Sequence, residues 1–368
     1  MYSQNDLDEA VASGAVSAEQ ANALRAFVDQ QRATPSVDEE QFRLITGFND
    51  IFVSIAAAIL LFAVAFIGQN IGESLGLVLE ADGPSPIAPL FVAATSWGLA
   101  LFFTAKRRMA LPSILLLLAF VGGVFATVGF GLVTAIGEPA GDQEALYAGI
   151  IGSVSGAAAA AAAWFHWKRF RVPITVAAGA LAVSAILAGL LIAVLGNPEN
   201  YRDLLLGFVL LLGVGVFLFA MRWDSSDPAR VTRRSDVAFW LHLLAAPMIV
   251  HPVFTLLGLN DGNATIMEGL VVVLLYVVIG LTALAIDRRA LLVSALAYVL
   301  YALNRLFEEL GTVELNVALT ALIIGSALLM LSAFWHQARA MVVKPLPTGL
   351  RDRLPLVDRA APIPQPAA

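Results

Sequence analysis

The sequence contains no cysteine, only four histidines and little charge. Of its 368 residues 14% are charged, whereas an average soluble domain is about a quarter charged. The lack of cysteine excludes a disulfide-stapled secreted domain and any site built on a thiolate. At 59% hydrophobic residues and a mean hydropathy of +0.81, the chain is too apolar for a soluble or a disordered protein. The composition predicts an all-α polytopic membrane protein.

The apolar residues are gathered in long runs, each close to the roughly 20 residues that a bilayer-spanning helix needs. We expect ten transmembrane helices, at about 51–69, 87–105, 111–136, 145–167, 173–196, 203–222, 237–258, 266–286, 290–310 and 315–338. Short basic turns recur between descending and ascending runs, so we expect repeated transmembrane hairpins.

The positive charges lie almost entirely on one side of this arrangement. With the N-terminus inside, 20 of the 22 lysines and arginines fall in inner segments, and only Arg202 and Arg305 fall outside. Because cytoplasmic loops carry an excess of basic residues, this partition supports both the count and the orientation. We therefore expect both termini in the cytoplasm.

The two ends of the chain differ from its apolar centre. Residues 1–34 read as a cytoplasmic helical hairpin, 35–50 as a linker and juxtamembrane segment, 51–340 as the transmembrane domain, and 341–368 as a disordered proline-rich cytoplasmic tail. The first 50 residues hold nine acids and three arginines, a net charge of −6. They include no apolar run, so we expect no cleavable signal peptide.

Within the hairpin, Gly14 is placed to end a first helix, and Ser17 with Gln20 forms a capping box that begins a second. Two short helices bury little surface. We therefore expect residues 1–34 to bind a protein partner or another copy of the chain.

Small residues predict where the helices approach one another, because lipid supplies no hydrophobic drive for their association. Gly123 lies in a stripe of small residues in the third expected span, and Gly152 and Gly156 lie in the fourth. These spans are antiparallel neighbours, and we expect them to pack face to face.

Motifs of soluble enzymes are absent: no phosphate-binding loop, dinucleotide fingerprint or zinc-protease motif occurs. We therefore predict no enzyme activity, no metal, no cofactor and, since the cytoplasmic hairpin is acidic, no nucleic-acid partner. His166 and His336 are interpreted as interfacial residues. Asp236 and Asp287 lie near inner basic clusters and are interpreted as salt-bridged surface groups.

The seventh expected span carries Pro247 and Pro252, which we expect to interrupt its hydrogen-bond ladder and to move His251 out of helical geometry. Broken helices line substrate sites in many transporters. A kink satisfied by neighbouring groups is the alternative interpretation.

Four polar residues of the seventh to ninth spans define a candidate outward-facing pocket for a solute or a lipid. Counting 1.5 Å per residue places His251 and Arg305 in the outer third of the bilayer, and Tyr276 and Tyr301 near its midplane. The alternative is an arginine that reaches the outer headgroups while the tyrosines pack separately.

The stretch Ala12-Ser-Gly-Ala-Val-Ser17-Ala-Glu-Gln20-Ala-Asn-Ala-Leu24 resembles the opening of an uncharacterised bacterial family of predicted membrane proteins, classed as a domain of unknown function. The hairpin around it covers about a tenth of the chain, and the rest is similar in layout only. This resemblance implies a bacterial inner-membrane location and carries over no functional residue.

Three functional classes are open. A small-solute transporter predicts a water-accessible cavity near His251 and Arg305. A structural or regulatory membrane component predicts tight packing there and a function carried by residues 1–34. A membrane enzyme ranks third, because no convincing nucleophile or metal set is present.

Overall fold

The computed structural model describes residues 10–24, 48–80, 83–137, 143–228, 230, 232–258, 266–289, 291–296, 299–300, 316–351 and 354–355. Within these ranges the protein is all-helical and has no strand, which confirms the predicted fold class. The chain divides into two units, Met1–Phe42 with Asp358–Ala368, and Arg43–Val357.

In the first unit, the described residues form the predicted turn between two helices. Gly14 adopts φ of 73°, a left-handed conformation that glycine tolerates, where the first helix ends. The Ser17 backbone N–H donates to Gln20 Oε1, and the Gln20 N–H donates to Ser17 Oγ, both at 3.1 Å. The capping box is thus confirmed, because each side chain satisfies a backbone donor at the other residue.

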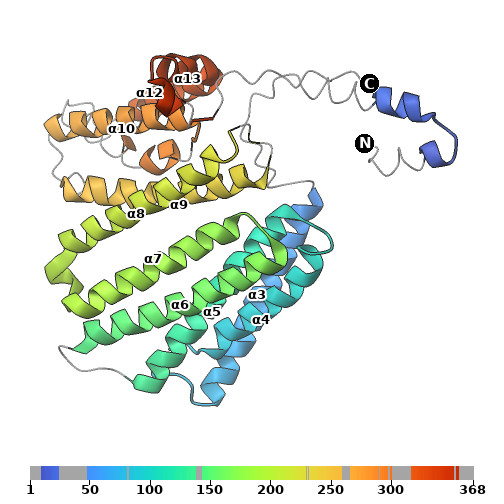
Figure 1. Ribbon diagram of the computed structural model, residues 1–368. Helices are drawn as coiled ribbons and strands as arrows, with labels where there is room; N and C mark the ends of the chain where they lie inside the picture. The colour runs from blue at the N-terminus through green and yellow to red at the C-terminus, as the bar shows by residue number, and fades with distance from the viewer. Residues whose placement is uncertain are drawn as a thin grey trace. The chain divides into compact units, whose positions relative to one another are not determined.

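The second unit is a set of long helices packed against their neighbours in sequence (Figure 1). In chain order they are α3 (Phe48–Ser74), α4 (Ile87–Phe103), α5 (Ala110–Ile136), α6 (Glu144–Phe170), α7 (Ile174–Leu195), the short turn η2 (Pro198–Tyr201), α8 (Arg202–Ser225), α9 (Arg233–Leu256), α10 (Ile266–Ile286), α12 (Asn316–Ala333), α13 (Trp335–Val343) and α14 (Thr348–Arg351).

Six of the described helices are long and apolar enough to cross a membrane: α3, α5, α6, α7, α8 together with η2, and α9. α12 and α13 pass the same test only as a pair, which bends by 76°, while α4 and the apolar part of α10 are shorter. Every predicted run except 290–310 overlaps one of these helices. Of that run the structure describes only 291–296 and 299–300, which are helical. The count of ten spans therefore stays a prediction.

The basic turns share a backbone conformation. Arg108, Arg171, Arg230 and Asp287 have φ between 54° and 57°, and each follows a helix end that the sequence predicts to be an inner one. For a residue with a Cβ this left-handed conformation costs about 1–2 kcal/mol. It reverses the chain within a few residues, so the next helix can begin directly.

The third and fourth expected spans, α5 and α6, do pack against each other, but Gly123 and Gly156 do not form that contact. A Cβ at Gly123 would lie 2.8 Å from the Pro89 carbonyl oxygen of α4, and a Cβ at Gly156 would lie 3.0 Å from the Ala182 carbonyl oxygen of α7. A Cβ at Gly152 would meet nothing within 4 Å. Gly123 and Gly156 therefore face different neighbours rather than each other.

The tightest approach joins α6 to α7. A Cβ at Gly149 would lie 2.5 Å from the Gly189 carbonyl oxygen, and Ser153 Oγ donates to the Ile186 carbonyl at 3.1 Å. α6 also meets α5, through Ser155 beside Gly129. α6 thus carries two stripes of small residues, one for each neighbour.

The two prolines do not break α9, which runs without interruption from Arg233 to Leu256 and keeps His251 helical. Pro252 removes the donor that would normally serve the Met248 carbonyl. Gly213 of α8 packs directly against that carbonyl, since a Cβ there would lie 2.9 Å from Met248 O. Close packing of the neighbouring helix thus shields the gap in the ladder, as membrane helices often allow.

Part of the C-terminal segment packs against the later helices. Leu354 is buried in a cluster with Leu284, Leu292 and Trp335. Together with α13 and α14, it lies in or beside the stretch 341–368 that we expected to be a disordered tail.

Candidate functional site

The predicted outer pocket is described in part. His251 of α9 is exposed, and Tyr276 of α10 is half-buried. The Tyr276 hydroxyl is buried and has no hydrogen-bond partner among the described residues. Tyr301 and Arg305 lie outside the described residues, so the pocket stays a prediction.

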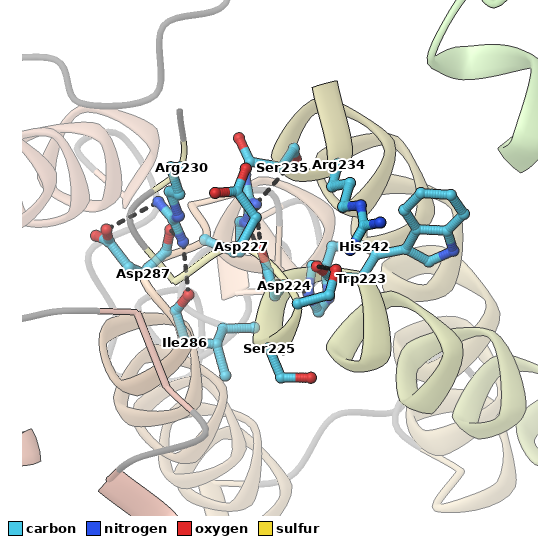
Figure 2. Close-up of polar contacts among 12 residues, drawn as sticks. Trp223, Asp224, Ser225, Asp227, Arg230, Arg234, Ser235, His242, Ile286 and Asp287 are labelled. Carbon is cyan, nitrogen blue, oxygen red and sulfur yellow. Dashed lines mark hydrogen bonds and ion pairs between the residues drawn. The ribbon is translucent and has the colours of Figure 1, made fainter. Parts of the chain in front are cut away.

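The described residues instead bring together a set of buried charges where α8 and α10 end and α9 begins, on the side that the sequence predicts to be the inner one. We call it the inner ion cluster: Asp224, Arg230, His242, Asp287, Arg288, Trp335 and Arg339. Figure 2 shows part of the cluster, in which Arg230 is joined to Asp287 and Ile286, and Asp224 lies with His242. The contacts of the whole cluster join the end of α8 and the turn after it to α9 and to the turn that follows α10.

Asp224 is the centre of the first half of this cluster. One carboxylate oxygen accepts from Arg288 Nη2, and the other lies 2.9 Å from His242 Nε2 and 3.3 Å from Arg288 Nε. Arg288 Nη2 also donates to the Ser235 carbonyl at 3.0 Å. Asp224, His242 and Arg288 are 1%, 0% and 2% exposed. The three side chains thus satisfy one another's hydrogen-bonding groups in a position that water does not reach.

Asp287 is the centre of the second half. Its carboxylate accepts from Arg230 Nη1 at 2.9 Å and from Trp335 Nε1 at 2.7 Å, with Arg339 Nε at 3.8 Å. Arg230 Nη2 donates to the Ile286 and Asp287 carbonyls at 3.0 and 3.1 Å. Arg339 Nη2 donates to the Pro355 carbonyl. This half therefore ties the turn after α8, the end of α10, α13 and the C-terminal segment together.

The backbone explains how two adjacent residues serve the two halves. Asp287 has φ of 57°, and its side chain reaches Arg230 while that of Arg288 reaches Asp224. The left-handed turn at Asp287 thus joins both halves of the inner ion cluster.

Burial makes these contacts energetically demanding. Removing a charge from water costs several kcal/mol, and a buried pair recovers this only with good geometry and further hydrogen bonds. The carboxylates of Asp224 and Asp287 each have at least two partners. Loss of one partner would leave an uncompensated charge in a buried position.

Asp224 also fixes the proton of His242. A carboxylate paired with arginine only accepts hydrogen bonds, so His242 Nε2 carries the hydrogen. Its Nδ1 is buried without a partner among the described residues, and its ring lies edge-on to Phe217 at 5.2 Å. His242 can therefore gain or lose a proton only at Nδ1 while this contact persists. The described residues hold no group of three or more histidines, aspartates or glutamates placed to bind a metal ion.

Sequence reasoning identified these residues only in part. Asp287 is ion-paired as interpreted, but it is buried rather than on the surface, whereas Asp236 is exposed. The sequence analysis used three of the arginines only to orient the chain in the membrane: Arg230, Arg288 and Arg339. A usable signal was present: within 51–340, the four acids on the predicted inner side all lie between 224 and 287.

His166 also differs from its interfacial interpretation. It is buried between α6 and α7, with Nδ1 3.2 Å from Thr175 Oγ1, and its ring lies 4.6 Å from that of Phe170. The rings of Trp97 and Phe120 also pack against the His166 ring.

Comparison with known proteins identifies no relative. No protein-family model, curated protein or solved structure matches this chain. The function must therefore be argued from the inner ion cluster and the helices that carry it.

Proposed function

We propose that this protein is a non-enzymatic, ten-span membrane transporter for a small solute, with both termini in the cytoplasm of a bacterial cell. The inner ion cluster is its cytoplasmic closure. The resemblance of the opening stretch supports a bacterial origin, and the partition of lysine and arginine supports the orientation.

The observation that carries the proposal is the fully buried contact of Asp224 with His242 and Arg288. It joins α8, α9 and the turn after α10 at a single point. A buried ion pair is weak evidence for stability as such, because apolar residues of similar size often stabilise as well or better. Its best-attested use is to select one of two arrangements, which is what a closure must do.

Two features of α9 support the same interpretation. His242 has one ring nitrogen fixed by Asp224 and the other without a partner among the described residues, so a change of charge at His242 acts directly on the closure. The prolines of α9 lie on the outer side of His242, where His251 and Tyr276 belong to the predicted pocket. The proposal thus places a solute site outside the closure and on the same helix.

A reporter cysteine tests the closure, because the natural chain has no thiol to remove. Ala246 is buried on α9 one turn beyond His242. In the Ala246→Cys protein, Asp224→Asn is expected to raise the labelling rate by a membrane-permeant maleimide at least about tenfold, since the substitution removes the carboxylate that Arg288 contacts.

The matched control is Ala163→Cys, which is buried on α6 in a separate cluster. Its labelling should stay unchanged on Asp224→Asn. If Asp224→Asn leaves labelling slow at both cysteines, the closure is rejected. If it raises the labelling rate equally at both, the protein has unfolded generally.

A structural or regulatory role through residues 1–34 is the second candidate, favoured by the capping box that builds the hairpin turn. Deletion of residues 1–34 separates the two functions. Loss of the cellular phenotype while the reporter response is kept would favour the regulatory role.

A further inference from the structure

The inner turns of α3–α7 differ in charge from those of α8–α13. Six basic residues follow α4 or end α6, and all six are exposed: Lys106, Arg107, Arg108, Lys168, Arg169 and Arg171. No ion pair with a described residue involves any of them. We call this set the basic patch. In the inner ion cluster, by contrast, three arginines are buried against carboxylates.

Within the part of the chain that the structure describes, no acid forms a salt bridge with the basic patch. From residue 51 to 196 every acid falls in an outer segment of the predicted topology: Glu73, Glu80, Asp82, Glu138, Asp142 and Glu144. Asp50, at the inner start of α3, is 3% exposed. Because orientation alone is satisfied by a few positive charges, six exposed ones without an acidic partner among the described residues indicate a binding surface.

Ring packing holds the two halves of the basic patch together. The Trp97 ring of α4 lies 5.2 Å from that of Phe170, the last residue of α6. Phe170 and Phe103 pack against the same cluster of α3, α4 and α5. The turns α4–α5 and α6–α7 therefore lie at one end of the helices as neighbours (Figure 1).

Two of these cations lie next to aromatic side chains that are exposed on the helix surface, where lipid is expected. Lys168 Nζ lies 4.1 Å from the ring centre of Trp164, which is 51% exposed, and Arg107 Cζ lies 5.5 Å from that of Phe102, which is 44% exposed. Aromatic rings of this kind occupy the headgroup level of a bilayer. The positive groups thus lie at the depth of the phosphates.

From this arrangement we infer that the basic patch binds an anionic phospholipid of the inner leaflet, best one with two phosphates. Lys106, Arg107 and Arg108 meet one phosphate, and Lys168, Arg169 and Arg171 meet the other. The acyl chains lie along the exposed surfaces of Phe102 and Trp164. Clusters of four to eight basic residues next to a membrane helix typically recognise such lipids.

Lipid titration of the purified full-length chain in detergent tests this, with bound lipid counted by native mass spectrometry. Tetraoleoyl cardiolipin should bind more tightly than dioleoyl phosphatidylglycerol, and both more tightly than dioleoyl phosphatidylcholine. Each cation near the surface strengthens binding roughly fivefold. The triple variant Lys106→Gln, Arg107→Gln, Lys168→Gln should therefore weaken cardiolipin binding by about a hundredfold.

The matched control neutralises three exposed inner cations of α8 and α9, Arg222→Gln, Arg233→Gln and Arg234→Gln, and should change cardiolipin binding less than about twofold. If the triple variant fails to fold, the single variants Lys106→Gln and Lys168→Gln replace it, with about a fivefold loss each.

Four results would overturn the inference. Equal binding of phosphatidylcholine, or equal loss in the control, would show that the basic patch is not selective. Full displacement of the lipid by millimolar inorganic phosphate would show a site for free phosphate. Lipid binding that appears only after deletion of the acidic residues 1–34 would show that the chain itself occupies the basic patch.

Discussion

At the scale of single residues, Asp224 decides whether the inner ion cluster holds. Its two oxygens serve Arg288 and His242, and all three groups are buried. Asp224→Asn keeps the shape of the side chain but removes the carboxylate that Arg288 and His242 contact. We expect the free energy of unfolding in detergent to fall by about 3–5 kcal/mol, measured by denaturant titration.

Asp203→Asn is the matched control, because Asp203 is an exposed aspartate at the other end of α8. Its unfolding free energy should stay within about 0.5 kcal/mol of the wild type. The double variant Asp224→Asn, Arg288→Gln should recover part of the loss, since it removes both charges. Equal stability of the two single variants would contradict the role given to Asp224.

The residue scale also shows the limit of sequence reasoning. The pairing of Asp287 with a basic neighbour was predictable from the charges around it. Its burial was not, because Trp335 and Arg339 reach it from a helix almost fifty residues later. Charge patterns show which groups attract one another, whereas burial depends on which distant segment covers them.

At the scale of helices, the close approach of α6 to α7 yields a test within one helix. Gly149→Leu would force a side chain into the backbone of Gly189 and Ala193. We expect a lower folding yield and a loss of at least about 1–3 kcal/mol in unfolding free energy. Gly152 lies three residues further along α6, and a Cβ there would meet nothing within 4 Å. Gly152→Leu should therefore leave the folding yield and the unfolding free energy close to wild type. Similar losses in the two variants would reject this interface.

Close helix packing at these glycines was predictable, but the helix that each glycine packs against was not. Small residues at Gly123 and Gly156 correctly indicated close contact, yet they pack against α4 and α7. Because α6 carries small residues on two faces, the sequence cannot say which face meets which neighbour. For α9, proline rules alone predicted a break, whereas Gly213 packs over the carbonyl that Pro252 leaves without a donor.

At the scale of the whole molecule, orientation in the membrane determines what the two charged regions can do. The partition of basic residues predicts that the turn after α8 faces the cytoplasm and that the turn after α7 faces outward. Asn197 and Ser226 are exposed residues in these two turns. Cysteines introduced there are unique labels, since the chain has no other thiol.

We expect a membrane-impermeant maleimide to label Asn197→Cys in bacterial cells whose inner membrane is intact, and Ser226→Cys only after that membrane is permeabilised. The two positions lie at opposite ends of α8, so they must give opposite results if α8 spans the bilayer. Labelling of Ser226→Cys without permeabilisation would place the inner ion cluster and the basic patch outside. A cytoplasmic closure and an inner-leaflet lipid site would then both be excluded, because each depends on the side that these arginines and lysines face.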